Sequence, residues 1–93
     1  MKQYELMTIT KTALGEDGST GVLNQVKDAI TDLGGKILNH DVWGKRKFAY
    51  PIKHDTEGFY NVVTFDLTAT KLPELKKALN LREDLVRYLV TLK

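Results

Sequence analysis

The order of its apolar patterns restricts the folds open to this sequence more than any other feature. Two segments repeat apolar residues at the three- and four-residue spacing of a helix, and four segments are rich in β-branched or aromatic residues. Strands are expected at residues 4–11, 36–52, 59–67 and 85–92. Helices are expected in two places, between Ser19 and Gly34 and after Thr70.

Both expected helices have one apolar side and recognisable ends. The stripe of the first comprises Val22, Val26, Ile30 and Leu33. A turn is expected at residues 15–19, and Ser19 or Thr20 can cap the helix that follows. The Gly34–Gly35 pair is expected to end it, because glycine accepts the left-handed conformation found after helices. The second stripe comprises Leu72, Leu75 and Leu79, with Pro73 in the first turn.

The second and third strands are expected to form a long hairpin. Gly44 lies inside the second strand and predicts a bulge or a close approach of two backbones. Residues 53–58 are mostly polar, end in glycine and predict the connection. The third strand alternates, with Val63, Phe65 and Leu67 on one face and Tyr60, Val62, Thr64 and Asp66 on the other.

The predicted fold class is α+β, with the ferredoxin-like order βαββαβ in a single domain over residues 1–93. In this arrangement both helices pack on one face of a four-stranded antiparallel sheet, and the other face stays open. An open face with aromatic and apolar residues is usually a binding surface, since monomers seldom expose large apolar patches.

The residues offer little for catalysis or for binding a metal. The chain has no cysteine, so it has no thiolate nucleophile, disulfide or cysteine-based zinc site. His40 and His54 each stand alone beside an aspartate and are interpreted as structural or solvated. The glycine-rich turns lack the pattern of a phosphate loop. We therefore expect no enzyme, no metal, no cofactor and no small-molecule substrate.

Targeting signals are not evident, and the cytoplasm is the expected location. Residues 1–5 contain an acid and alternate, unlike a secretory signal, and no apolar run approaches the roughly 20 residues of a membrane helix. The net charge of +2 does not decide whether the chain binds nucleic acid, because the clustering of cations matters more than their sum.

The most informative segment is residues 43–52, where three consecutive cations are flanked by Trp43, Phe48 and Tyr50. Alternation along a strand places Lys45 and Lys47 on one face and Arg46 on the other. On a protruding hairpin these cations can follow an RNA phosphate backbone.

Two structural interpretations of this segment stay open from the residues alone. The cations can be those of a solvated edge strand, where lysine guards against aggregation. The aromatic residues can simply pack in the hairpin or under a helix. A second basic group, Arg82 and Arg87 with Lys2 and Lys93 near the termini, would by itself be ordinary surface charge.

Residues 43–52 resemble the Gly-x-Arg-x-Leu-Ala-Tyr-Pro-Ile signature of the bacterial small-subunit ribosomal protein S6 family. Tyr4–Glu5, residues 58–60 and residues 81–87 also fall at the places expected for that family, and the resemblance extends over the whole chain. It implies a non-catalytic component of the small ribosomal subunit that binds the central domain of its RNA as a heterodimer with ribosomal protein S18. It implies no obligate homo-oligomer, and a cytoplasmic or an organellar ribosome.

The resemblance also implies which residues make these contacts. The RNA-binding candidates are Lys2, Lys45, Arg46, Lys47, Arg82 and Arg87. The candidates for the interface with the partner protein are Tyr50, Tyr60 and Val62. Lysine replaces arginine at some of the basic positions, which keeps the charge but loses bidentate phosphate geometry.

Thr8 and Thr10 depart from the family pattern, which usually has larger apolar residues there. Either the core is repacked or the hydroxyl groups find local partners. The alternative function is a ferredoxin-like regulatory module that binds a small ligand or self-associates, but no pocket of convergent polar groups is evident. A small hydrolase of the same topology would need an anion-binding loop and a positioned side-chain amide. Asn39 or Asn61 could supply the amide, but no phosphate-binding loop precedes either residue.

Overall fold

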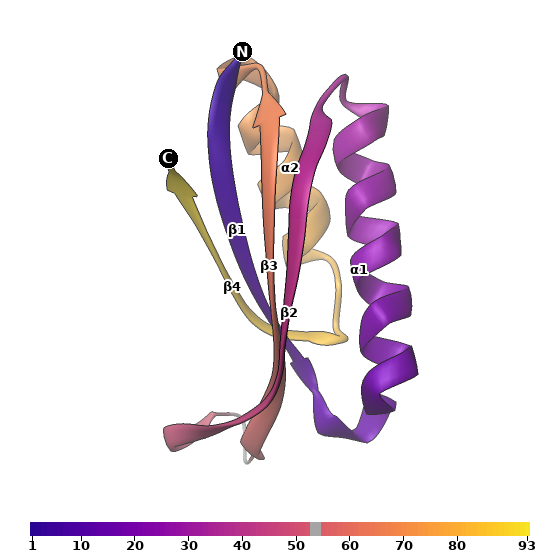
Figure 1. The fold of residues 1–93 in the computed structure, drawn as a ribbon, viewed down its shortest axis with the longest axis vertical. Helices are drawn as coiled ribbons and strands as arrows, with labels where there is room; N and C mark the ends of the chain where they lie inside the picture. The colour runs from indigo at the N-terminus through magenta and orange to yellow at the C-terminus, as the bar shows by residue number, and fades with distance from the viewer. Residues whose placement is uncertain (53–54) are drawn as a thin grey trace.

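The described part of the chain forms one antiparallel sheet with the strand order β2-β3-β1-β4 and two α-helices (Figure 1). The structure is a computed structural model that describes residues 1–52 and 55–93, with the side chains of residues 1–47 and 57–93. The elements in chain order are β1 (Lys2–Lys11), α1 (Gly15–Asp32), β2 (Lys36–Ile52), β3 (Asp55–Leu67), α2 (Leu72–Asn80) and β4 (Leu85–Leu92). This confirms the ferredoxin-like βαββαβ order.

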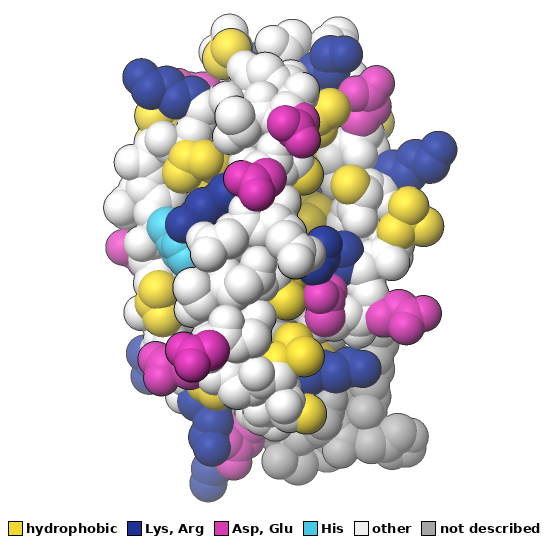
Figure 2. Space-filling view, turned by 90° about the vertical axis from the view of Figure 1, so that its right-hand side faces the viewer, with side chains coloured by type: hydrophobic (Ala, Val, Ile, Leu, Met, Phe, Trp, Pro, Cys, Tyr) yellow, Lys and Arg dark blue, Asp and Glu magenta, His cyan; other side chains and the backbone are white. Residues whose placement is uncertain are grey.

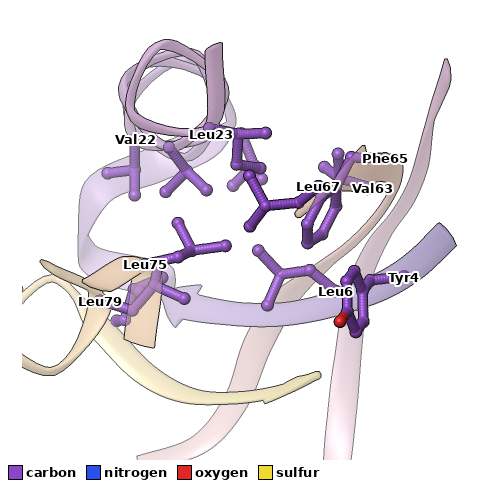
Figure 3. Close-up of a cluster of buried hydrophobic side chains, with 12 residues drawn as sticks. Tyr4, Leu6, Val22, Leu23, Val63, Phe65, Leu67, Leu75 and Leu79 are labelled. Atoms are coloured by element: carbon purple, nitrogen blue, oxygen red, sulfur yellow. The ribbon is translucent and has the colours of Figure 1, made fainter. Parts of the chain in front are cut away.

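Both helices pack on the same face of the sheet and enclose the core (Figure 1, Figure 3). Four of the core side chains labelled in Figure 3 come from α1 and α2, and they meet side chains of the two central strands: Val22, Leu23, Leu75 and Leu79 against Tyr4, Leu6, Val63, Phe65 and Leu67. The rings of Tyr4 and Phe65 stack with centroids 5.7 Å apart. Burial of each large apolar side chain contributes about 1.5–3 kcal/mol, so this cluster is the main source of stability.

Helix α1 begins earlier than the sequence predicts. It starts at Gly15, which has φ of +72°, directly after a turn of 3₁₀ helix at Thr12–Leu14. The expected turn at residues 15–19 and the expected cap at Ser19 or Thr20 are therefore wrong. A Cβ on Gly18 would lie 2.9 Å from the Cβ of Leu14, so glycine at this position allows a close approach inside the helix.

The end of α1 is as predicted. The amide of Gly34 donates to the carbonyl of Thr31 at 2.9 Å, and that of Gly35 donates to the carbonyl of Ile30 at 2.9 Å. Gly34 has φ of +86°, the left-handed conformation that such a helix end requires.

Strands β2 and β3 form a hairpin whose far end extends beyond the rest of the sheet (Figure 1). The pairing register shifts between Val42 and Gly44, and Gly44 has φ of +79°, which confirms the predicted bulge. β3 begins at Asp55, so residues 55–58 belong to the strand and not to the connection that was expected there. The expected connection residues 53–54, including His54, lie outside the described residues.

A buried polar network explains the unusual threonines of β1. The hydroxyl of Thr10 donates to Ser19 Oγ of α1 at 2.7 Å, and Asn61 Nδ2 of β3 donates to the same oxygen at 3.2 Å. His40 Nε2 lies 3.0 Å from Asn61 Oδ1, and because that oxygen only accepts, the imidazole donates. The hydroxyl of Thr8 donates to the carbonyl of Asn61 at 3.5 Å. The hydroxyl groups thus have local partners, and His40 is a structural histidine.

Candidate RNA and protein interface

The basic residues of β2 lie where the β2–β3 hairpin reaches the end of β1. Lys11 is the last β1 residue paired with β3, opposite Gly58, and Arg46 faces Gly58 from the other side. We call residues 45–52 and 55–58 the hairpin arm. The arm lies at the bottom of the view in Figure 1, and Figure 2 shows lysine and arginine side chains at the lower end of the side of the molecule that carries α1. The sheet therefore carries three consecutive cations, Lys45 to Lys47, on its projecting part.

The three cations of the arm differ in their contacts. Lys45 Nζ lies 3.3 Å from Glu57 Oε2 on the neighbouring strand, with 58% of the lysine side chain exposed. Exposed ion pairs of this kind contribute about 0–1 kcal/mol, so this pair can open at low cost. Arg46 and Lys47 are exposed and form no hydrogen bond or ion pair with any residue that the structure describes.

Arg87 and Tyr60 are aligned across the open face of the sheet. Ile9 is the Cα partner of both residues, with Tyr60 on one side and Arg87 on the other. Gly44 pairs with Tyr60 from the opposite edge. Arg87 is exposed on the edge strand β4, so one row of the sheet runs from the bulge, through Tyr60, to an exposed cationic side chain.

Arg82 is set apart from the other basic candidates, because its guanidinium group is engaged within the chain. Nε and Nη2 donate to the two carboxylate oxygens of Asp84 at 3.1 and 2.8 Å, and Nη2 also donates to Gln25 Oε1 at 2.6 Å. Only 26% of the side chain is exposed. Arg82 therefore joins α1 to the connection between α2 and β4, and this structural role is enough to explain an arginine here.

Lys2 lies far from the arm. It pairs with Leu67 at the start of the ten-residue strand β1, whereas the arm lies at the other end (Figure 1). Ten residues at about 3.3 Å each separate the two ends by about 30 Å. The structure thus brings Lys45, Arg46 and Lys47 together, places Arg87 on the far edge of the same sheet, and leaves Lys2 at the opposite end.

The open face of the sheet is apolar near its centre. Val62, Met7 and Leu89 form a row across three strands, because Met7 is the Cα partner of both of the others. Val62 itself is only 6% exposed, whereas Leu89 is 52% exposed. Among the interface candidates, Tyr60 is half-buried, Val62 contributes little surface, and the side chain of Tyr50 lies outside the described residues.

A family model for ribosomal protein S6 matches residues 3–91. The chain belongs to the ribosomal protein S6 family. It is 44% identical over 92 residues to the small ribosomal subunit protein bS6 of Dictyoglomus turgidum, with 99% of this chain and 95% of that protein covered. It is 40% identical over 90 residues to the bS6 protein of Fusobacterium nucleatum, with 97% and 96% covered.

The same family has a solved structure that closely resembles this fold. The crystal structure of 30S ribosomal protein S6 from Thermotoga maritima superposes with a TM-score of 0.94 at 30% identity, covering 99% of this chain and 87% of that one. The chain is therefore a protein of the small ribosomal subunit, located in the ribosome with ribosomal RNA, and not an enzyme. Among the described residues, no helix is long and apolar enough to span a membrane.

Sequence reasoning about this S6-family chain did not single out two features of the surface. Leu89 lies two positions after Arg87 in the strand expected at residues 85–92, so alternation places both on one face, and this signal could have identified Leu89 as an interface residue. A shallow groove of about 470 Å³ between α2 and β4 had no such signal. Its polar groups are partly engaged with one another, since the Tyr88 hydroxyl donates to Asn80 Oδ1 at 2.6 Å.

Proposed function

We propose that this small-subunit ribosomal protein binds the central domain of the small-subunit RNA and pairs with ribosomal protein S18. The observation that carries the proposal is the pair of exposed cations, Arg46 and Lys47, which have no partner among the described residues and lie on a projecting arm. In a ribosomal protein, the natural counterpart of such cations is RNA phosphate.

The RNA half of the proposal uses charge more than base recognition. Cations that neutralise phosphates release bound counterions, which makes the affinity strongly dependent on salt. Arg46 and Lys47 act from the arm, Arg87 acts from the edge strand, and Lys45 joins them when its exposed pair with Glu57 opens. Lys2 makes a separate contact at the other end of β1. Arg82 supports the site by holding the chain that leads into β4.

The protein half uses the open face of the sheet. Leu89 is half exposed on this face, and Tyr60 lies in the adjacent row. Val62 lies in the same row as Leu89 and adds little exposed surface. Apolar and aromatic residues surrounded by polar ones are typical of protein interfaces. We expect Tyr50, on the arm, to extend the same interface.

The two halves are expected to support each other. Each surface is small, so each partner binds weakly alone. The heterodimer presents a larger basic surface to the RNA. The coupling free energy is the amount by which binding of S18 strengthens binding of the RNA, and the reverse. We expect the whole chain, residues 1–93, to act as one domain and to form no obligate homo-oligomer. The expected location is the cytoplasmic ribosome, and an organellar ribosome is the alternative.

The test is a salt titration of binding to a central-domain fragment of the small-subunit RNA, with and without S18. We expect tight binding only with S18, with an affinity that falls steeply as salt increases. The absence of binding under both conditions would reject the proposed function. Equal binding with and without S18 would reject the cooperative part of it.

A further inference from the structure

We propose that Trp43 is a stacking platform for an unpaired RNA nucleotide that crosses the edge strand β2, with its neighbouring phosphates bound by Arg46 on one face of the strand and by Lys47 on the other. The inference rests on the proposed RNA-binding function and deepens it, because it assigns part of the contact to an aromatic side chain instead of to charge alone.

The exposure of Trp43 is the first observation. The residue is 50% exposed and lies outside the core cluster. The simpler interpretation of an aromatic residue in this segment is that it packs under a helix. Trp43 does not fit that interpretation, because half of the residue is in contact with water. Tryptophan is among the residues enriched at contact surfaces, so a half-exposed tryptophan is a candidate for a contact with a partner.

The backbone around Trp43 supplies the second observation. Val42 pairs with Asn61 and Gly44 pairs with Tyr60, so Trp43 is the extra residue of the bulge and has no Cα partner on β3. β2 is also an edge strand, with no strand on its other side in the described sheet. A Cβ placed on Gly44 would meet no atom within 4 Å apart from its two chain neighbours, so no other element packs against the backbone next to Trp43.

The distribution of charge around Trp43 selects the partner. Arg46 and Lys47 follow it, exposed and without a partner among the described residues, whereas Asp41, two positions before it, is also exposed. A nucleotide stacked on Trp43 would therefore place its phosphates on the side of the arm and away from Asp41.

The same charges favour RNA over a protein at this place. Lysine is depleted in protein interfaces, and an exposed lysine such as Lys47, with no partner among the described residues, would be costly to bury beside Trp43 against a protein. Phosphates neutralise Arg46 and Lys47 while a base covers the ring. Stacking accepts any base, because every base has a flat aromatic face, but it requires a base whose own face is not covered by a neighbour.

The test uses the fact that Trp43 is the only tryptophan of the chain, so its fluorescence reports on this site alone. The full chain is titrated with the central-domain RNA fragment over a salt series, with S18 present, and the Trp43→Phe variant in the same mixture supplies the background signal. We expect the RNA to quench the Trp43 emission. We also expect Trp43→Ala to weaken RNA binding about fivefold or more at every salt concentration, with an unchanged salt slope, because stacking involves no counterion release.

The matched control is Leu81→Ala, which removes another exposed apolar side chain, one that is 76% exposed and lies after α2. It should leave affinity and fluorescence unchanged. Salt-dependent RNA binding with an unaltered Trp43 emission and an unaffected Trp43→Ala variant would overturn the stacking role but leave the proposed function intact. A change of emission on adding S18 without RNA, and none on adding RNA, would overturn it in favour of a protein contact. The absence of any RNA binding would reject both.

Discussion

The hydroxyl of Thr10 in β1 donates a hydrogen bond to Ser19 Oγ in α1 over 2.7 Å, and both side chains are buried. Ser19 also accepts from Asn61, which in turn contacts His40, so one polar network joins α1 to three strands of the sheet. A buried network of this kind is stabilising only while its members remain satisfied. It holds α1 over the strands that lead into the hairpin arm.

Thr10→Val tests this network. Valine matches the shape of threonine but removes the donor, leaving Ser19 and Asn61 with a changed set of partners. We expect the free energy of unfolding to fall by about 1–3 kcal/mol, the usual cost of leaving a buried polar group unsatisfied. Chemical denaturation measures it. The control is Thr20→Val, at an exposed position of α1 next to Ser19. Its free energy of unfolding should stay within about 0.5 kcal/mol of that of the parent. A Thr10→Val variant as stable as this control would contradict the role of the network.

Arg82 is predicted to act on stability before it acts on RNA. Lysine keeps the charge but cannot make the two-pronged contact with Asp84 while also reaching Gln25. We expect Arg82→Lys to lower the free energy of unfolding by about 1 kcal/mol, because a partly buried charged hydrogen bond is lost. Denaturation and RNA affinity are measured on the same preparation. Full stability together with a large loss of RNA affinity would make Arg82 a direct RNA ligand instead.

Two glycines are predicted to respond to alanine in opposite directions. Gly44 has φ of +79° with open space around it, so alanine there costs about 1–2 kcal/mol through backbone strain alone. Gly21 lies inside α1 with no atom within 4 Å of a new Cβ, and alanine there should stabilise the protein by about 0.5–1 kcal/mol. Thermal unfolding of both variants checks the signs. A neutral Gly44→Ala would show that the bulge does not depend on glycine.

The proposed interface with S18 is tested by Leu89→Ser and Tyr60→Ala. Leu89 is 52% exposed on the open face, so serine should leave folding intact and weaken S18 binding by about tenfold, as expected for an interface residue worth somewhat more than 1 kcal/mol. Tyr60→Ala should weaken it as well. Leu81→Ala, away from the open face, supplies the control. S18 affinities equal to that of the parent for both variants would remove this face from the interface.

The sequence predicts those parts of the fold that depend on local patterns. Residues 85–92 alternate cleanly and form β4 over Leu85–Leu92, and Gly34–Gly35 ends α1 where expected. The start of α1 was missed because Gly15, Gly18 and Gly21 have low helix propensity, and contacts made only in the folded chain override it.

The contacts of the candidate site could be predicted only in part. The exposure of Arg46 and Lys47 follows from a basic run on an edge strand, which a sequence can indicate. The contact of Arg82 with Gln25 could not be foreseen, because the two residues are 57 positions apart. Val62 was predicted to lie on the open face of the sheet, but its side chain is buried. The reason is that β3 is an inner strand, with β2 on one side and β1 on the other.

The most direct test of the account is the salt dependence of RNA binding by Arg46→Ala, measured beside Lys36→Ala with S18 present. Both variants remove one exposed cation from β2, but only Arg46 lies on the arm. We predict that Arg46→Ala lowers the affinity for the central-domain RNA and reduces the salt slope by about one, with unfolding free energy unchanged, whereas Lys36→Ala changes neither. Identical affinities and slopes for the two variants would contradict the claim that the arm binds RNA phosphates.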